Sequence, residues 1–286
     1  MKTKRKSQFS IVIKRITKNK LAMLGFFIII GLVILVIFAD YIAPYSYEEQ
    51  DYLALLQKPD LTSEHPLGTD NLGRDVLSRL IYGTRYSLKM GVFAVGLNAI
   101  FGLTLGAIAG YCGGWIDNAL MRFLDIFQSI PGILMAMALA AVFGSGLNSA
   151  IIALGITGFG GFARLIRASV LQLSGEEYVE AARAINARHH RILLRHIIPN
   201  ALAPIIIQVS MSIGATILAG ASMSFLGLGA QAPLPEWGTM LSDARNYMRD
   251  SGYLLIFPGL MIFFTVMAFN LLGDGLRDAL DPKLKD

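Results

Sequence analysis

IFQSIPGILMAMALAAVFGSGLNSAIIALGITGFGGFA, at residues 126–163, decides the fold, because its 38 residues include no Lys, Arg, Asp or Glu. An α-helix needs about 20 apolar residues to cross the hydrocarbon core of a bilayer. The run is therefore long enough for two crossings. Gly144-Ser145-Gly146-Leu147-Asn148, near its middle, has the composition of a turn, so we expect two transmembrane helices that meet there.

Further uncharged runs lie on both sides of this stretch. They cover residues 21–39, 90–116, 201–226 and 253–272. The chain is therefore predicted to be an all-α polytopic membrane protein with six transmembrane helices. The composition agrees, since 54% of the 286 residues are hydrophobic and only 16% are charged, too few for the surface of a soluble domain. The single cysteine, Cys112, excludes an intrachain disulfide framework.

The distribution of Lys and Arg predicts the orientation. Residues 1–20 hold eight of them and no acidic residue. With this tail in the cytoplasm, six crossings place both termini inside, and the inside segments hold 18 of the 25 Lys and Arg residues. The net charge of +5 is then explained by Lys and Arg in the cytoplasmic segments, so it does not indicate a nucleic-acid partner. The first run is long for a signal peptide and lacks a small-residue cleavage site, so we expect it to remain as a helix.

We divide the chain into two parts. Residues 1–85 combine the basic tail, the first transmembrane helix and an outer segment, and residues 86–286 form a five-helix core with a cytoplasmic loop at 174–200. In the outer segment, Thr69 or Asp70 is expected to cap an amphipathic helix that lies on the membrane surface. The apolar residues of that helix recur at helical spacing: Val76, Leu77, Leu80 and Ile81.

Glycine and proline predict features of the core helices. Gly102, Gly106 and Gly110 are four residues apart and share one helix face, where they permit close approach of a second helix. Pro131 and Pro258 lie inside predicted spans, and each is expected to kink its helix.

The segment at residues 227–238 is too apolar for a free loop and too rich in Gly and Pro for a helix. Backbone of this kind at membrane depth must be buried in protein or line a watery cavity. We expect a partly re-entrant loop with Trp237 at the membrane interface.

The 174–200 loop has the pattern of two short helices. Ser174 and Glu177 match a capping box at the start of the first helix. This helix is expected to end near Ile185, because Asn186 accepts left-handed backbone angles. The second helix is expected to stop before Pro199, since the residue preceding a proline avoids helical angles.

The same loop carries groups suited to docking. Ala181 and Ala182 lack bulk, so a partner's groove could close on the backbone, and the carboxylate of Glu180 could pair with an arginine in two hydrogen bonds. Arg183 and Arg188 could hold acidic side chains or anionic lipid headgroups. An interfacial helix pair held only by phospholipid remains the alternative on physical grounds alone.

Glu180-Ala181-Ala182, the turn at Asn186 and Ile197-Ile198-Pro199 together resemble the coupling signature of bacterial ABC-importer permeases. Further segments resemble the second-subunit type of the dipeptide, oligopeptide and nickel branch of that family. They are Leu67-Gly68-Thr69-Asp70 with Gly73-Arg74-Asp75-Val76, Ser224-Phe225-Leu226-Gly227-Leu228-Gly229 with Pro235-Glu236-Trp237-Gly238, and Phe269-Asn270-Leu271-Leu272-Gly273-Asp274-Gly275-Leu276-Arg277-Asp278 with Asp281-Pro282. The family usually has glycine where this chain has Asn186.

The resemblance implies a type I importer permease fold in the bacterial cell membrane and a transport subunit rather than an enzyme. It implies as partners a second homologous permease subunit, two cytosolic ATPase subunits that bind ATP and Mg²⁺, and an extracellular substrate-binding protein. No cofactor or metal is expected on this chain, which lacks the Gly-x-x-x-x-Gly-Lys-Ser/Thr motif and a spaced Cys/His set. The implied substrate is a di- or oligopeptide, with nickel or a nickel chelate as the alternative.

Polar residues within the spans are candidates for the substrate path: Gln128, Gln208, Ser212 and Asn270. Such residues either face a shared cavity or bridge helices by hydrogen bonds, and the sequence leaves both open. Asp125 is expected to pair with Arg122. A secondary transporter would need ionisable residues near the membrane midplane, which the uncharged runs lack, and a membrane scaffold would not need the 174–200 loop.

Overall fold

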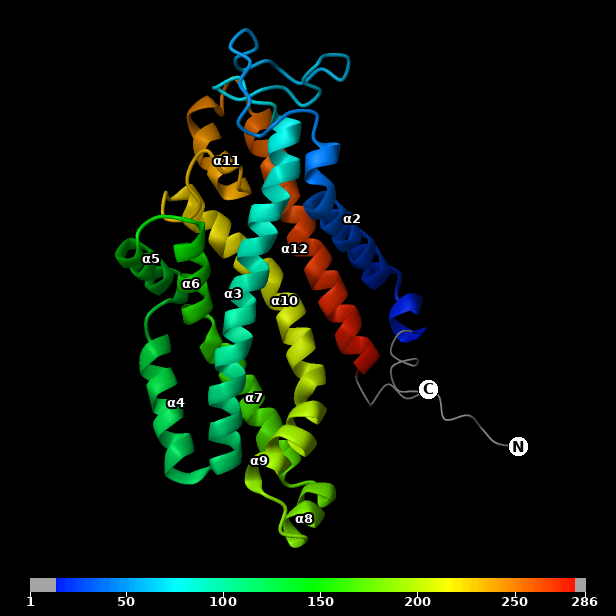
Figure 1. Ribbon diagram of the computed structural model, residues 1–286, viewed down its shortest axis with the longest axis vertical. Helices are drawn as coiled ribbons and strands as arrows, with labels where there is room; N and C mark the ends of the chain where they lie inside the picture. The colour runs from blue at the N-terminus through cyan, green and yellow to red at the C-terminus, as the bar shows by residue number, and fades with distance from the viewer. Residues whose placement is uncertain (1–13, 281–286) are drawn as a thin grey trace, which may run out of the picture.

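The computed structural model describes residues 14–280, and within them it is built from helices and connecting loops without a strand. Figure 1 shows long helices running side by side between a loop-rich end and an end formed by short helices. In chain order the elements are α2 (Lys20–Ile42), α3 (Val76–Cys112), α4 (Gly114–Gln128), α5 (Gly132–Phe143), α6 (Leu147–Thr157), α7 (Phe159–Ser174), α8 (Glu177–Ala184), α9 (His189–Ile192), a π-helical turn (Leu193–Ile197), α10 (Ile198–Phe225), α11 (Trp237–Ala244), a 3₁₀ turn (Arg245–Tyr247) and α12 (Tyr253–Leu280).

Five helical stretches are long and apolar enough to cross a membrane, and a sixth arises if the bent pair α4–α5 counts as one span. The bend between α4 and α5 is 81°, and Pro131 lies at the break, so the predicted kink is confirmed there. The predicted turn after α5 is also confirmed, because α5 ends at Phe143 and α6 begins at Leu147. Pro258 lies inside an unbroken α12, and its kink stays a prediction.

Helix α3 is the central element, and α7 packs closely along it (Figure 1). A β-carbon added at Gly106 would overlap the carbonyl oxygen of Ala163 on α7, and one added at Gly110 would lie 2.8 Å from the carbonyl oxygen of Arg167. The predicted glycine face is therefore confirmed as the α3–α7 contact.

Residues 43–75 form a lobe without helices at one end of the molecule, here called the loop lobe (Figure 1). It is held to α12 by Tyr253, whose hydroxyl donates to the carbonyl oxygens of Gln57 at 2.9 Å and Thr69 at 2.7 Å. The lobe thus has a fixed attachment to the helix bundle.

The predicted surface helix in this region is wrong. Asp75, rather than Thr69 or Asp70, caps the helix, since its Oδ2 accepts from the backbone N–H of Ser78 at 2.7 Å. The helix is α3 itself, and its first turns are buried, with Arg79 only 2% exposed. Spacing alone could not show this, because Arg79 is buried only through the acidic partners that the fold brings to it.

Those partners form a cluster of four charges, here called the charge cluster. Arg74 Nε lies 2.6 Å and Arg79 Nε 3.5 Å from Asp70 Oδ2. Both guanidinium groups also reach Asp243 on α11, at 3.6 Å and 4.0 Å. Burial raises the pKa of Asp243, while Arg79 and Arg74 act to lower it. The cluster joins the loop lobe, α3 and α11.

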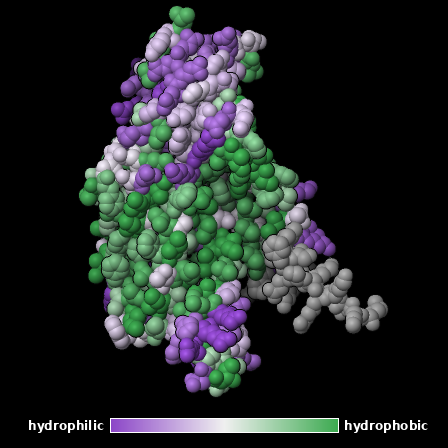
Figure 2. All heavy atoms as spheres, in the orientation of Figure 1, coloured by the Kyte–Doolittle hydropathy of each residue, from purple (hydrophilic) through white to green (hydrophobic). Residues whose placement is uncertain are grey.

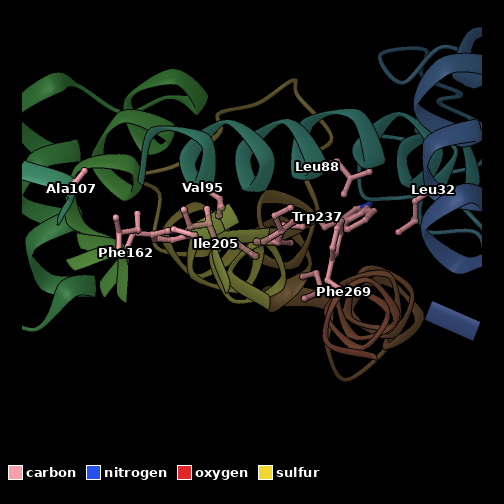
Figure 3. Packing of buried hydrophobic residues seen from close by; sticks show 14 of the residues in the cluster. Leu32, Leu88, Val95, Ala107, Phe162, Ile205, Trp237 and Phe269 are labelled. Carbon is pink, nitrogen blue, oxygen red and sulfur yellow. The ribbon is translucent and has the colours of Figure 1, made fainter. Parts of the chain in front are cut away.

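Trp237 is completely buried in the chain, so it does not face lipid headgroups as an interfacial Trp would, and its depth in the membrane stays a prediction. Figure 3 shows it in a row of apolar side chains with Leu88 and Phe269. Its indole N–H donates to the carbonyl oxygen of Leu80 at 3.3 Å, which removes the main cost of burying the ring. The residue before it, Glu236, caps α11 by accepting from the N–H of Thr239.

Candidate functional site

The 174–200 loop forms the end of the molecule opposite the loop lobe (Figure 1). Its first helix, α8, begins at Glu177 without a side-chain cap, so the predicted capping box is wrong. Ser174 is still the last residue of α7, and its hydroxyl is buried without a hydrogen-bond partner among residues 14–280. The chain leaves α7 through Gly175, whose N–H bonds to the carbonyl oxygens of Gln172 and Leu173.

The turn after α8 follows the prediction. Asn186 has φ of +58°, in the left-handed region. Its N–H donates to the carbonyl oxygen of Arg183 at 2.9 Å, and the N–H of Ala187 donates to that of Ala182 at 3.1 Å. These two bonds are the Schellman arrangement that closes a helix end. The joint between α8 and α9 is therefore a defined turn.

The predicted helix end before Pro199 is wrong. The chain passes from α9 through the π-helical turn into α10, and residues 189–225 form one helical stretch. The N–H of Ile198 bonds to the carbonyl oxygen of Leu193, five residues back. This wider turn relieves the clash that a proline ring makes with the preceding turn of an α-helix. The loop is thus continuous with a membrane-spanning helix.

The structure exposes most of the predicted docking residues: Glu180, Ala181, Arg183, Asn186 and Arg188. Ala182 is an exception, because it is 6% exposed and belongs to the hydrophobic core with Val179 and Ile192. Val179 and Ala182 are three residues apart and share the inner face of α8. Ala182 thus fixes α8 to the bundle and is not available to a partner.

One candidate contact was missed from the sequence. Ile185, between α8 and Asn186, is 81% exposed. Figure 2 shows polar side chains gathered at this end of the molecule, with an apolar patch at the tip. The available signal was an isoleucine outside the buried stripe of α8, at the turn that Asn186 makes. Single exposed apolar residues are common on protein surfaces. Ile185 is a candidate contact because it lies at the turn that follows α8, within five residues of the exposed Glu180 and Arg183.

Helix α3 meets the loop at its C-terminal end. The hydroxyl of Tyr111 lies 2.9 Å from Nδ1 of His189, and the two rings contact edge to face. Helix α9 is thereby tied to the same helix that carries Arg79 at the loop lobe.

Two ion pairs connect α4 to α7 on this half of the molecule. Arg167 contacts both carboxylate oxygens of Asp117, with Nη2 2.6 Å from Oδ2. Arg164 Nη2 lies 2.9 Å from Asp125 Oδ1, so the predicted pairing of Asp125 with Arg122 is wrong. The bend at Pro131 and the course of α7 bring Arg164 near, which no local spacing reveals.

The four predicted path residues do not form one group. Gln208 donates to the hydroxyl of Ser212 at 3.2 Å, within α10. Asn270 lines a mostly apolar cavity of about 580 Å³ between α10, α11 and α12. Gln128 lines another, of about 310 Å³, at the Pro131 break. A role in a substrate path stays a prediction for each.

The sequence matches two protein families. The family described as "binding-protein-dependent transport system inner membrane component" matches residues 102–286. The family described as "N-terminal TM domain of oligopeptide transport permease C" matches residues 7–59.

Individual proteins agree with these matches. The dipeptide transport system permease protein DppC of Alkalihalophilus pseudofirmus is 47% identical over 272 residues, which cover 95% of this chain and 89% of that protein. The glutathione transport system permease protein GsiD of Pectobacterium atrosepticum is 46% identical over 273 residues, covering 95% and 90%. A solved structure of the MetNI methionine ABC transporter, in an inward-facing conformation, has a chain with the same fold, with a TM-score of 0.59 at 21% identity, covering 72% of this chain and 98% of that one.

Proposed function

Because this chain belongs to the binding-protein-dependent transport system inner membrane component family, whose members are multi-pass ABC permeases of the bacterial plasma membrane, we propose that it forms half of the translocation path of an ATP-driven peptide importer. The 174–200 loop is its coupling element. Helix α8 and the Asn186 turn dock on a cytosolic ATPase subunit, and the continuous helix from α9 to α10 carries the ATPase's movement into the membrane.

The rigid, exposed tip of the loop is the observation that supports this role. Ile185 offers an apolar anchor, and Glu180 and Arg183 offer charges for hydrogen-bonded pairs at its edge. The Schellman turn and the buried side chain of Ala182 hold the tip in one geometry. A preorganised tip binds without the cost of ordering itself, and it transmits force without flexing.

The proposed assembly contains a second homologous permease subunit, two ATPase subunits that bind ATP and Mg²⁺, and an extracellular substrate-binding protein. The loop and both termini lie in the cytoplasm, and the loop lobe lies outside. The eight Lys and Arg residues before α2 support this orientation. The pairing of the described ends supports placing both on one side of the membrane, since Asn19 Nδ2 lies 3.4 Å from Asp278 Oδ2. In Figure 1 the start of α2 and the end of α12 point toward the end of the molecule that carries α8.

The substrate we propose is a di- or oligopeptide. The names of the two similar permeases support a peptide, since one belongs to a dipeptide system and the other to a glutathione system. In the proposed cycle, ATP draws the ATPase subunits together and the docked loops move with them. The path then opens outward to receive substrate from the binding protein, and hydrolysis returns it to an inward-facing state.

Glu180→Lys and Ile185→Asp are expected to abolish coupling. Each change places an unfavourable charge in the docking contact, and loss of a hot spot of about 2 kcal/mol or more weakens binding at least thirtyfold. Substrate-stimulated ATPase activity of the reconstituted complex should fall accordingly, while the amount of chain inserted in the membrane should not change.

Glu177→Lys is the matched control, since it makes the same charge change one turn earlier on the same helix. Equal loss of activity in this control would show an effect of net charge rather than of docking. In a Cys112→Ser background, Ile185→Cys should crosslink to an ATPase subunit. A cysteine at 185 that never reaches an ATPase subunit would refute the docking role.

The substrate is tested separately, with the same complex and its binding protein loaded with peptides of different length or with nickel. Stimulation by peptides is the expected result. Stimulation by nickel alone would show that the peptide assignment is wrong.

A further inference from the structure

A cavity of about 550 Å³ lies where the end of α3 meets the 174–200 loop. It is lined by Tyr111, Cys112, Arg183, His189, His190 and Leu193. These residues come from α3, α8, α9 and the first position of the π-helical turn, so the cavity exists only because the loop folds back on α3. Helical turns of the π type are frequent at functional sites.

The chemistry of the lining favours an anion. Among residues 14–280, no carboxylate lines the cavity, and the one permanently charged group there is the guanidinium of Arg183. Two imidazoles and the Tyr111 hydroxyl add hydrogen-bonding groups. Arg183 can present two parallel N–H donors, the geometry that a phosphate group accepts.

The rest of the lining is apolar. Beside the polar groups lies an apolar surface that could contact a hydrocarbon chain. It is formed by Leu193, Cys112 and the ring of Tyr111. Figure 2 shows the broad apolar band of the molecule giving way to polar side chains at the end that carries α8. The last residue of α3, Cys112, lines the cavity, so the cavity lies at the end of α3 that meets the 174–200 loop. In the proposed orientation this end of α3 is the cytoplasmic one, where headgroups of the inner leaflet lie.

From these observations we propose that the cavity binds the phosphate headgroup of an anionic phospholipid from the inner leaflet. Arg183 pairs with the phosphate, and His190 donates a hydrogen bond to it. Tyr111 and His189 share a hydrogen bond, so one of that pair donates to the phosphate. The start of an acyl chain covers the apolar surface. The bound lipid fastens α8 to the end of α3. This site goes beyond the proposed coupling role. It shares Arg183 with the edge of the docking tip, but its lining does not include Glu180 or Ile185.

The full-length chain, purified without ATPase subunits, is to be titrated with phosphatidylglycerol and with phosphatidylcholine, and bound lipid counted by native mass spectrometry. We expect preferential retention of phosphatidylglycerol. Arg183→Gln should lower its affinity about fivefold, the contribution of one basic side chain near an anionic membrane surface. His190→Ala should also lower it. Arg191→Gln is the matched control, because Arg191 is exposed on α9 but does not line the cavity.

The proposal would be refuted if the chain retained the two lipids equally. It would also be refuted if Arg191→Gln and Arg183→Gln lowered the affinity for phosphatidylglycerol equally. A second experiment adds inorganic phosphate as a competitor of the bound lipid. If millimolar phosphate displaced the lipid in the wild-type chain, the ligand would be a soluble phosphate and the lipid assignment would be wrong. Because no ATPase subunit is present, failure of the docking proposal would leave this result unchanged.

Discussion

Asp70→Ala is expected to lower the free energy of unfolding by about 3–5 kcal/mol, the cost of removing one partner from a buried ion pair. Asp70 is the shared acceptor of the charge cluster, and the side chains of Arg74 and Arg79 are only 4% and 2% exposed. Without it, both guanidinium groups depend on the more distant Asp243. The backbone N–H groups of Leu72 and Arg74 also lose their acceptor.

The measurement is thermal or denaturant unfolding in detergent, with limited proteolysis of the loop lobe as a second readout. Asp60→Ala is the control, because Asp60 is exposed in the same lobe and its carboxylate bonds, among the described residues, only to groups of Thr62. Its bonds to Ser63 use the backbone carbonyl and survive the substitution. Asp60→Ala should change the free energy of unfolding by no more than about 1 kcal/mol. If the two variants were equally stable, the cluster would not be what holds the loop lobe to α3 and α11.

Gly106→Leu is expected to destabilise the chain by about 3 kcal/mol, the upper end of the usual cost of overpacking a core. A β-carbon at this position would overlap the Ala163 carbonyl oxygen and lie 3.0 Å from the β-carbon of Ile166. The nearest clashing atom belongs to the backbone of α7, which cannot move aside as a side chain can. Helices α3 and α7 must therefore separate, and the packing between them must loosen.

Gly96→Leu is the matched control on the same helix, since nothing lies within 4 Å of a β-carbon there. It should leave the unfolding temperature in detergent unchanged or slightly raised, because leucine favours a helix more than glycine does. If the Gly106→Leu chain unfolded at the wild-type temperature, close packing of α3 on α7 would not contribute to the free energy of unfolding.

Features encoded by one local property were predictable. Asn186 adopts the left-handed angles that few residues accept, Pro131 breaks its span, and the spacing of Gly102, Gly106 and Gly110 marks the face that meets α7. Each depends on the residue and its near neighbours along the helix.

Features that depend on distant partners were not predictable. Trp237 is interior because α3 supplies an acceptor for its indole N–H, and Arg79 is interior because α11 and Asp70 supply its carboxylates. In the 174–200 loop, the sequence predicted the turn at Asn186, but it could not show that Ala182 is buried while Ile185 is exposed. Which side of this short helix meets the bundle is set by its neighbours α7 and α9, not by α8 alone.

Helix α3 has 37 residues in one unbroken stretch, which corresponds to about 55 Å, longer than the 40–45 Å of a complete bilayer with its headgroups. Arg79 near its start and Tyr111 near its end therefore lie at opposite ends of one continuous helix. Pivoting by about 5° at the Tyr111 end would displace the other end by about 5 Å. A displacement at the 174–200 loop would therefore be carried to the loop lobe by one continuous helix.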